Sequence, residues 1–212
     1  SVEKFVDMET PHTGAPKALK ILNYGDNFDA SFLYGLFGLN AGRVKSISQN
    51  MPSVYELLPS RNYFNDYPYY VFNASDSSDR LSYDQTSTYL KASGRNSALV
   101  DRADTFHQEI DSLNPADFGV ETYNIVGCGM PTIGQFYILD SDASHPIYNI
   151  RMINGDGTVP LKSAEAMQAT STYYVRGIAH ALLPSTSGVK ELVSSLLSTT
   201  TTFDLSPYSN LS

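Results

Sequence analysis

Residues 122–128, which read Thr-Tyr-Asn-Ile-Val-Gly-Cys, narrow the choice of fold more than any other segment. The run is mostly β-branched and apolar, and it lacks the regular alternation of a strand with one face in water. We expect a strand buried on both faces, which is typical of a sheet covered by helices. Further strand-like runs occupy residues 2–8, 135–139, 147–153 and 172–176, so the predicted fold class is α/β.

A long segment between the first two strands has a different character. Residues 24–120 are rich in Asn, Asp, Ser and Tyr, and their most helix-like part is residues 101–113. No alternation of strand and helix is visible there, so we interpret the segment as an insertion of helices and loops. The predicted organisation is a core over residues 1–23 and 121–200, the insertion between them, and a tail over residues 201–212.

The charge balance limits the partners of the chain. The formal net charge is −8 at pH 7, and we expect no nucleic-acid partner, since that binding needs clustered Lys and Arg. No run of about 18 apolar residues exists, so the sequence holds no candidate membrane span. The single cysteine, Cys128, ends the buried strand and is expected to be a plain buried thiol.

Two residues carry the strongest chemical signal. Asp156 lies between two glycines directly after a predicted strand, where its carboxylate can project toward a partner. A surface turn in which the aspartate bonds its own backbone has the same local pattern. His180 follows the strand at residues 172–176, and a lone histidine is more often structural. However, acid and then histidine after successive strands is the order of an α/β-hydrolase triad, so we expect the two side chains to touch.

Five short segments carry motifs that occur together, and in this order, in one protein family. Residues 10–16 read Thr-Pro-His-Thr-Gly-Ala-Pro, and residues 51–61 end in Pro-Ser-Arg. Residues 127–132 read Gly-Cys-Gly-Met-Pro-Thr, residues 154–161 contain the Gly-Asp-Gly turn, and residues 177–180 read Gly-Ile-Ala-His. Together they resemble the lecithin:cholesterol acyltransferase family and its phospholipase and phospholipid:diacylglycerol acyltransferase relatives.

The resemblance implies the C-terminal part of an α/β-hydrolase fold, with residues 24–120 as an inserted, mainly helical cap. It implies that Asp156 is the acid and His180 the base of a Ser-Asp-His triad. The family's Gly-x-Ser-x-Gly nucleophile segment should precede residues 10–16, but no such motif occurs in the chain. The chain is then either a fragment or processed piece, or a degenerate homologue. Its start within a strand pattern favours the fragment.

The resemblance further implies a serine lipase, phospholipase or O-acyltransferase that acts on lipid acyl esters. We expect this chain alone to be inactive and to need the upstream segment of the same polypeptide that carries the serine. The expected partners are a lipid or acyl-ester substrate and, through the cap, a membrane surface. No cofactor and no metal are expected. The alternatives are a non-catalytic hydrolase-like binding module and an amidase or peptidase with the same triad.

Three other histidines are weaker candidates. His12 lies in the Thr-Pro loop, where packing is the expected role. His107 lies in a helical stretch with acidic neighbours, and we expect it on a solvated face. His145 precedes a proline in the loop between two strands, and it could replace His180 only if the strand assignment is wrong.

Two groups in the insertion complete the candidates. Asp76, Asp79 and Asp84 could bind calcium, but they lack the twelve-residue loop pattern, so a solvated loop is expected. The aromatic residues of the insertion could line an acyl site or simply pack the cap. The residues concerned are Phe32, Tyr34, Phe37, Tyr55 and Tyr63.

Overall fold

A computed structural model describes residues 2–26, 40–74, 80–140, 147–198, 204 and 206–208. The chain forms two compact units, each built from separate stretches of sequence. Unit 1 comprises Ser1–Thr13, Asp111–Ile133 and Met152–Ser212. Unit 2 comprises Gly14–Ile110 and Gly134–Arg151.

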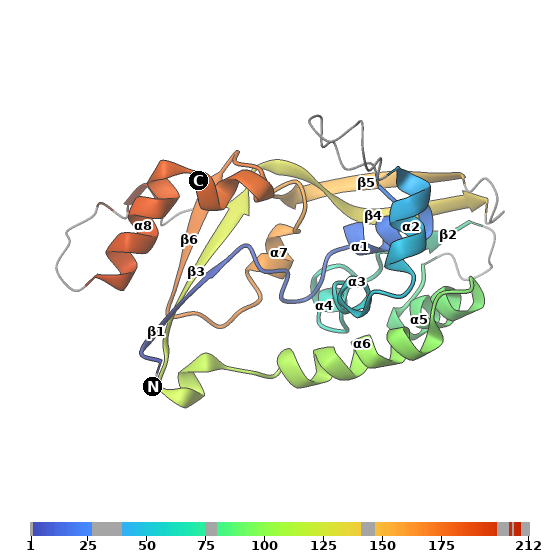
Figure 1. The fold of residues 1–212 in the computed structure, drawn as a ribbon, viewed down its shortest axis with the longest axis horizontal. Helices are drawn as coiled ribbons and strands as arrows, with labels where there is room; N and C mark the ends of the chain where they lie inside the picture. Colours follow the sequence, from blue (N-terminus) through green and yellow to red (C-terminus); the bar gives the residue numbers. More distant parts are fainter. Residues whose placement is uncertain are drawn as a thin grey trace. The chain divides into compact units, whose positions relative to one another are not determined.

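Unit 1 contains a parallel sheet of three strands in the order β1-β3-β6 (Figure 1). The strands are β1 (Lys4–Met8), β3 (Glu121–Cys128) and β6 (Ser171–Arg176). Every residue of β3 after Glu121 is buried, as expected for the central strand of a covered sheet. The carboxyl ends of all three strands therefore lie at one edge of the sheet.

Helices and loops cover both faces of this sheet. On one face, Ile125 and Val175 belong to a buried cluster with residues of η2 (His180–Ser185) and α8 (Ser187–Leu197). On the other face, Val126 packs in a second cluster with residues of α7 (Leu161–Ala164). Two short 3-10 helices, η1 (Pro115–Phe118) and η3 (Ser206–Tyr208), complete the unit.

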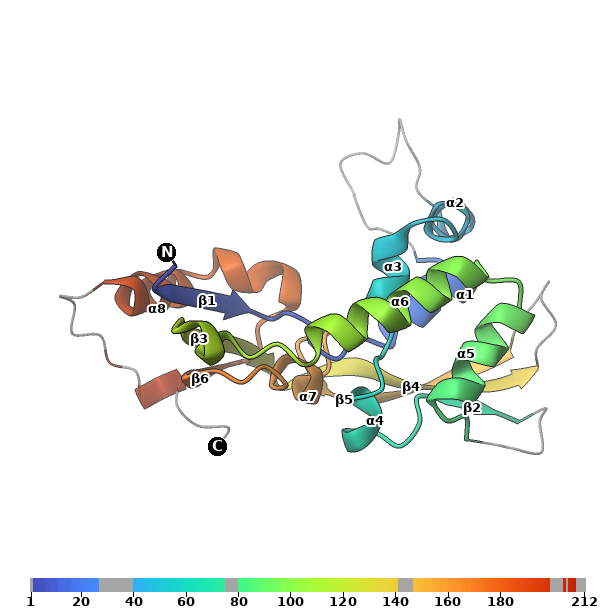
Figure 2. The ribbon, with the colours of Figure 1, turned by 90° about the horizontal axis from the view of Figure 1, so that it is seen from below.

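Unit 2 combines short helices with a second sheet of order β2-β4-β5, in which β2 and β4 are parallel. Helix α3 contacts both α1 and α6, and α6 also contacts α5 (Figure 2). The elements wholly within unit 2 are α1 (Lys17–Tyr24), α2 (Ala41–Ser48), α3 (Pro52–Glu56), α4 (Tyr63–Asp66), β2 (Val71–Asn73), α5 (Tyr83–Ala92) and α6 (Ser97–Ile110). The strands β4 (Met130–Asp140) and β5 (Ile147–Gly155) run through both units, since residues 130–133 and 152–155 belong to unit 1. None of the described helices is long and apolar enough to span a bilayer.

Local sequence explains where several of these helices begin. Ser82 and Gln85 form a reciprocal capping box at the start of α5, which satisfies two backbone N–H groups. Asn40 accepts a hydrogen bond from the N–H of Arg43 at the start of α2.

The side chains of Tyr55 and Tyr63 are fully buried, so these two candidate lining residues pack the interior of unit 2.

The α/β class predicted from the sequence is confirmed, but some boundaries differ. Unit 2 begins at Gly14 and includes residues 134–151, which we had expected in the core. The reason is strand pairing, because Phe136 of β4 pairs with Val71 of β2 in the insertion. Helix α7 is a single turn, Leu161–Ala164. In the tail, Tyr208 packs against the unit 1 core.

Candidate active site

Asp156 occupies a tight turn that follows β5, and its side chain is only 1% exposed. Its Oδ1 accepts hydrogen bonds from the N–H groups of Thr158 at 2.8 Å and Val159 at 2.7 Å. The aspartate therefore bonds its own turn, as the structural interpretation of the motif expected. Because the turn uses only one carboxylate oxygen, Oδ2 is left for another partner.

The glycines and a threonine explain why this turn can form. A Cβ at Gly155 would collide with the carbonyl oxygen of Val159, so no larger residue fits there. Gly157 has a φ of +90°, which favours glycine. Its N–H donates to Thr132 Oγ1 at 2.8 Å. Thr132 ends the Gly-Cys-Gly-Met-Pro-Thr segment, so two of the five motif segments support each other.

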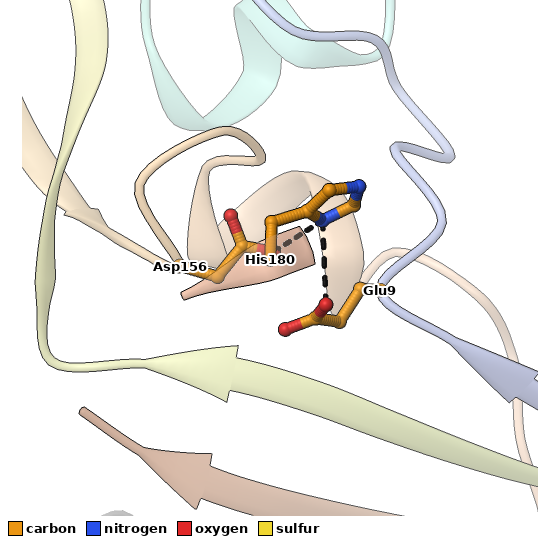
Figure 3. Close-up of side chains that lie close together, drawn as sticks. All are labelled: Glu9, Asp156 and His180. Carbon is orange, nitrogen blue, oxygen red and sulfur yellow. Dashed lines mark hydrogen bonds and ion pairs between the residues drawn. The ribbon is translucent and has the colours of Figure 1, made fainter. Parts of the chain in front are cut away.

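His180 meets Asp156 through both its side chain and its backbone. Its Nδ1 lies 2.9 Å from Asp156 Oδ2, and its N–H donates to the Asp156 carbonyl oxygen at 3.0 Å. His180 is the first residue of η2, so it begins a helical turn instead of continuing the loop. The predicted contact between the two side chains is confirmed. The imidazole side chain is 38% exposed, and Nε2 points away from the carboxylates (Figure 3).

Glu9 is a third member of the cluster that sequence reasoning missed. It directly follows β1 and is 2% exposed, and its Oε2 lies 3.3 Å from Nδ1 of His180 (Figure 3). The available signal was its position, since an acidic residue at the end of a parallel strand faces the edge where the other strands also end. The Thr-Pro loop that follows was interpreted only through its resemblance to the family.

The three groups shift one another's proton affinity. Burial alone would raise the pKa of Asp156, but hydrogen bonds from His180 and from the turn N–H groups outweigh it and lower that pKa. Burial raises the pKa of Glu9 to about 7. Hydrogen bonds to Asp156 and Glu9 raise the pKa of His180 to about 9. The two carboxyl groups therefore stabilise the charged form of the His180 imidazole.

The same three side chains are the candidates for holding a metal ion among the described residues. Their ligand atoms lie within 4.8 Å of one another. However, the 2.9 Å between Nδ1 and Asp156 Oδ2 is the length of a charge-assisted hydrogen bond. Two ligands of a tetrahedral zinc ion lie further apart, at about 3.4 Å. The geometry therefore fits a shared proton better than a metal.

The remaining histidines have other partners. His12 Nε2 lies 2.9 Å from Asp7 Oδ2 in unit 1. The prediction of a solvated His107 is wrong, because it is 5% exposed and its Nε2 lies 2.9 Å from the Glu56 carbonyl oxygen. The helix face that carries it packs against α3. His145 lies outside the described residues.

The remaining candidates are Cys128, the aspartates of the insertion and its aromatic residues. Cys128 is 1% exposed, which confirms the buried thiol. Asp84 forms an ion pair with Arg61 at 2.9 Å. The other residues of these groups lie outside the described residues; they are Phe32, Tyr34, Phe37, Asp76 and Asp79.

Comparison with known proteins adds one family. The family model described as Lecithin:cholesterol acyltransferase matches residues 1–102, which include β1 and most of unit 2. No curated protein matches the chain. The match indicates a lipid acyltransferase-like or lipase-like function.

Proposed function

We propose that this chain supplies the acid and the base of a serine hydrolase. The proposal starts from the match of residues 1–102 to the lecithin:cholesterol acyltransferase family. Asp156 is the acid, His180 is the base, and the nucleophilic serine lies in an upstream segment of the same polypeptide. The substrate class is lipid acyl esters, whose acyl group passes to water or to an alcohol.

The contact between Asp156 Oδ2 and His180 Nδ1, at 2.9 Å, is the observation that carries this proposal. A carboxylate on Nδ1 selects the tautomer in which Nε2 is free to accept a proton. In the proposed reaction Nε2 takes the proton of the serine hydroxyl as its oxygen attacks the ester carbonyl. The same proton then passes to the leaving alcohol, and the acyl-enzyme remains. Asp156 stabilises the imidazolium between these two steps.

Sheet topology leaves a place for the serine. Among the described strands, β1 pairs only with β3, so its second edge is open to a further parallel strand. A nucleophile at the carboxyl end of that strand would lie at the sheet edge where Glu9, Asp156 and His180 gather.

Exposed apolar side chains of unit 2 support the assignment of lipid as substrate. Ile47, Met51 and Leu57 are 53%, 42% and 42% exposed, and they lie close together in sequence. Apolar side chains of this kind are suited to shallow contact with a lipid surface. We therefore assign the peripheral membrane contact to the stretch formed by α2, α3 and the residues between and after them.

Turnover on phospholipid vesicles tests the proposal. The full polypeptide, with its upstream segment, should release fatty acid or transfer it to an added alcohol. His180→Ala and Asp156→Ala should each reduce the rate by at least about a thousandfold while the far-ultraviolet circular dichroism is kept. His12→Ala, a matched change outside the pair, should keep the rate within about threefold of the wild type, the change expected of a structural residue.

Two results would count against the proposal. Full turnover in His180→Ala would move the base elsewhere. No turnover on any acyl ester by the full polypeptide, although it is folded, would favour the non-catalytic binding module instead.

A further inference from the structure

Glu9 lies beside His180 but has no place in a Ser-Asp-His triad. Its N–H donates to the Ile125 carbonyl oxygen at 2.9 Å, which fixes the backbone against β3. From there the side chain reaches Nδ1, the same imidazole nitrogen that Asp156 contacts (Figure 3). Two carboxylates, one after β1 and one after β5, therefore converge on a single N–H group.

The backbone of Glu9 is unusual for a residue with a side chain. Its φ is +54°, and it is the only non-glycine residue with positive φ in the described part of the chain. Glycine adopts this left-handed conformation at no steric cost, whereas other residues are strained there. A turn that served only to change chain direction would be best made by glycine. A glutamate in this conformation therefore points to a role for the side chain itself.

Strand β3 makes room for both acids at Gly127. A Cβ at Gly127 would collide with Glu9 Oε1 and would lie only 2.7 Å from Asp156 Cβ. The absence of a side chain at this point of the central strand is therefore what lets the two carboxyl groups lie side by side.

The charges around His180 make the second carboxyl group responsive to pH. The charged groups that contact His180 within the described chain are Glu9 and Asp156. Burial raises the pKa of Glu9 to about 7, whereas the pKa of Asp156 is lowered. Glu9 Oε1 is buried without a hydrogen-bond partner among the described residues, which costs less for a neutral carboxyl than for a carboxylate. Glu9 is thus the member of the pair that gains or loses its proton near neutrality.

We propose that Glu9 is a second positioning carboxylate for His180, which shares the Nδ1 proton with Asp156 and orients the imidazole when Asp156 is removed. The inference rests on the proposed function, in which Nε2 accepts the proton of the serine. Asp156 Oδ1 is tied to the turn by two N–H groups, so Asp156 is the fixed acid and Glu9 the adjustable one. Ionised Glu9 adds a second negative charge beside the imidazolium that forms during turnover.

Nuclear magnetic resonance of histidine tests the contact without any turnover. The full polypeptide is labelled with ¹⁵N-histidine, and the four histidines of this chain are assigned by single substitutions. In the wild type, the His180 signal should titrate in two steps, because Glu9 and His180 titrate as a coupled pair. In Glu9→Gln it should titrate in one step, with a midpoint about one pH unit lower.

Asp7→Asn is the matched control, since Asp7 is also a buried acid near the end of β1 but contacts His12. It should leave the His180 titration unchanged. A single-step titration of His180 in the wild type would overturn the inference without any variant. An unchanged His180 midpoint in folded Glu9→Gln would overturn it as well.

Turnover then tests the ability of Glu9 to orient the imidazole. Asp156→Ala should keep at least about ten times the rate of the double variant Asp156→Ala/Glu9→Gln, which is well above the rate differences caused by ordinary structural substitutions. Glu9→Gln alone should shift the acidic limb of the pH–rate profile to lower pH. Equal rates for Asp156→Ala and the double variant, with both folded, would contradict the inference.

The two proposals fail in different ways. If His180→Ala keeps full turnover, the proposed function is wrong, while the His180 titration still reports on the contact with Glu9. If His180→Ala is inactive but Glu9→Gln changes neither the titration nor the pH–rate profile, only the inference about Glu9 is wrong.

Discussion

Unit 1 contains two aspartate–histidine pairs with the same nitrogen–oxygen distance. They differ in the ring nitrogen that faces the acid and in the groups that hold the acid. In both pairs a ring nitrogen lies 2.9 Å from an aspartate oxygen, and in both the aspartate is buried. His12 uses Nε2 toward Asp7, whereas His180 uses Nδ1 toward Asp156. Only the second arrangement turns Nε2 away from the acid, as a serine triad requires.

The second oxygen of each aspartate shows a further difference. Asp7 Oδ1 accepts the hydroxyl of Thr10 at 2.6 Å, while Asp156 Oδ1 is held by two backbone N–H groups. Backbone donors fix a carboxylate more rigidly than a rotatable hydroxyl does. A candidate catalytic pair therefore differs from a structural one in the ring nitrogen that faces the acid and in the hydrogen bonds to the second carboxylate oxygen. The nitrogen–oxygen distance alone does not distinguish them.

Replacing each aspartate with asparagine should give the largest difference in turnover between the two pairs. Asp156→Asn in the full polypeptide should lower turnover by about ten-thousandfold, because the amide favours the wrong imidazole tautomer. Asp7→Asn should change turnover by less than about threefold, as a substitution away from the reacting atoms does. Rates on an acyl ester measure both. Similar losses in the two variants would remove the distinction between the pairs.

The next largest expected effect is a difference in how the stability contributed by Glu9, beside His180, and by Asp7, beside His12, depends on pH. The native pKa of Glu9 is raised from 4.5 to about 7, so the folded state binds more protons than the unfolded state between these values. Stability should therefore fall as pH rises through this window, by at most about 3 kcal/mol from Glu9. The raised pKa of His180, about 9, extends the fall from pH 6.5 toward pH 9.

Urea unfolding at a series of pH values measures this effect. Glu9→Gln should flatten the part of the curve between about pH 4.5 and 7. Asp7→Asn should leave that part unchanged, because the pKa of Asp7 is lowered and its contribution is lost only as pH falls below 3.8. A Glu9→Gln curve that superposes on the wild type would mean that Glu9 is not a buried acid.

A pair of glycine substitutions gives the smallest expected effect. Gly127→Ala should destabilise unit 1 by about 1–3 kcal/mol and should reduce turnover, because the added methyl group displaces the two acids. Gly42→Ala is the matched control in α2, where the added Cβ would meet only Asn40 Oδ1 at 3.5 Å. It should stabilise the chain by about 0.5–1 kcal/mol. Thermal melting of both variants checks the signs, and a neutral Gly127→Ala would contradict the close packing at the acids.

The sequence was most informative about unit 1. Its three strands are parallel, so the residues that follow them are expected at one edge, and His180 follows β6 there. Asp156 follows β5, a strand of the second sheet, and still contacts His180 as predicted. Glu9 follows the same rule, but no motif drew attention to it. Its side-chain direction depends on the backbone twist at φ +54°, which a sequence pattern does not reveal.

The sequence was less informative about unit 2. The strand Val71–Asn73 has only three residues and lies in a Tyr-rich stretch, so nothing local indicated that β4 would pair with it. The burial of His107 depends likewise on the packing of α6 against α3, which are far apart in sequence. Both features follow from long-range packing that periodicity alone does not encode.

The most direct test of the central claim is the labelling of the full polypeptide by a fluorophosphonate probe, which reacts only with an activated serine. We predict labelling of a serine upstream of β1 in the wild type and in His12→Ala, and loss of labelling in His180→Ala. Labelling of His180→Ala at the wild-type rate would contradict the assignment of His180 as the base.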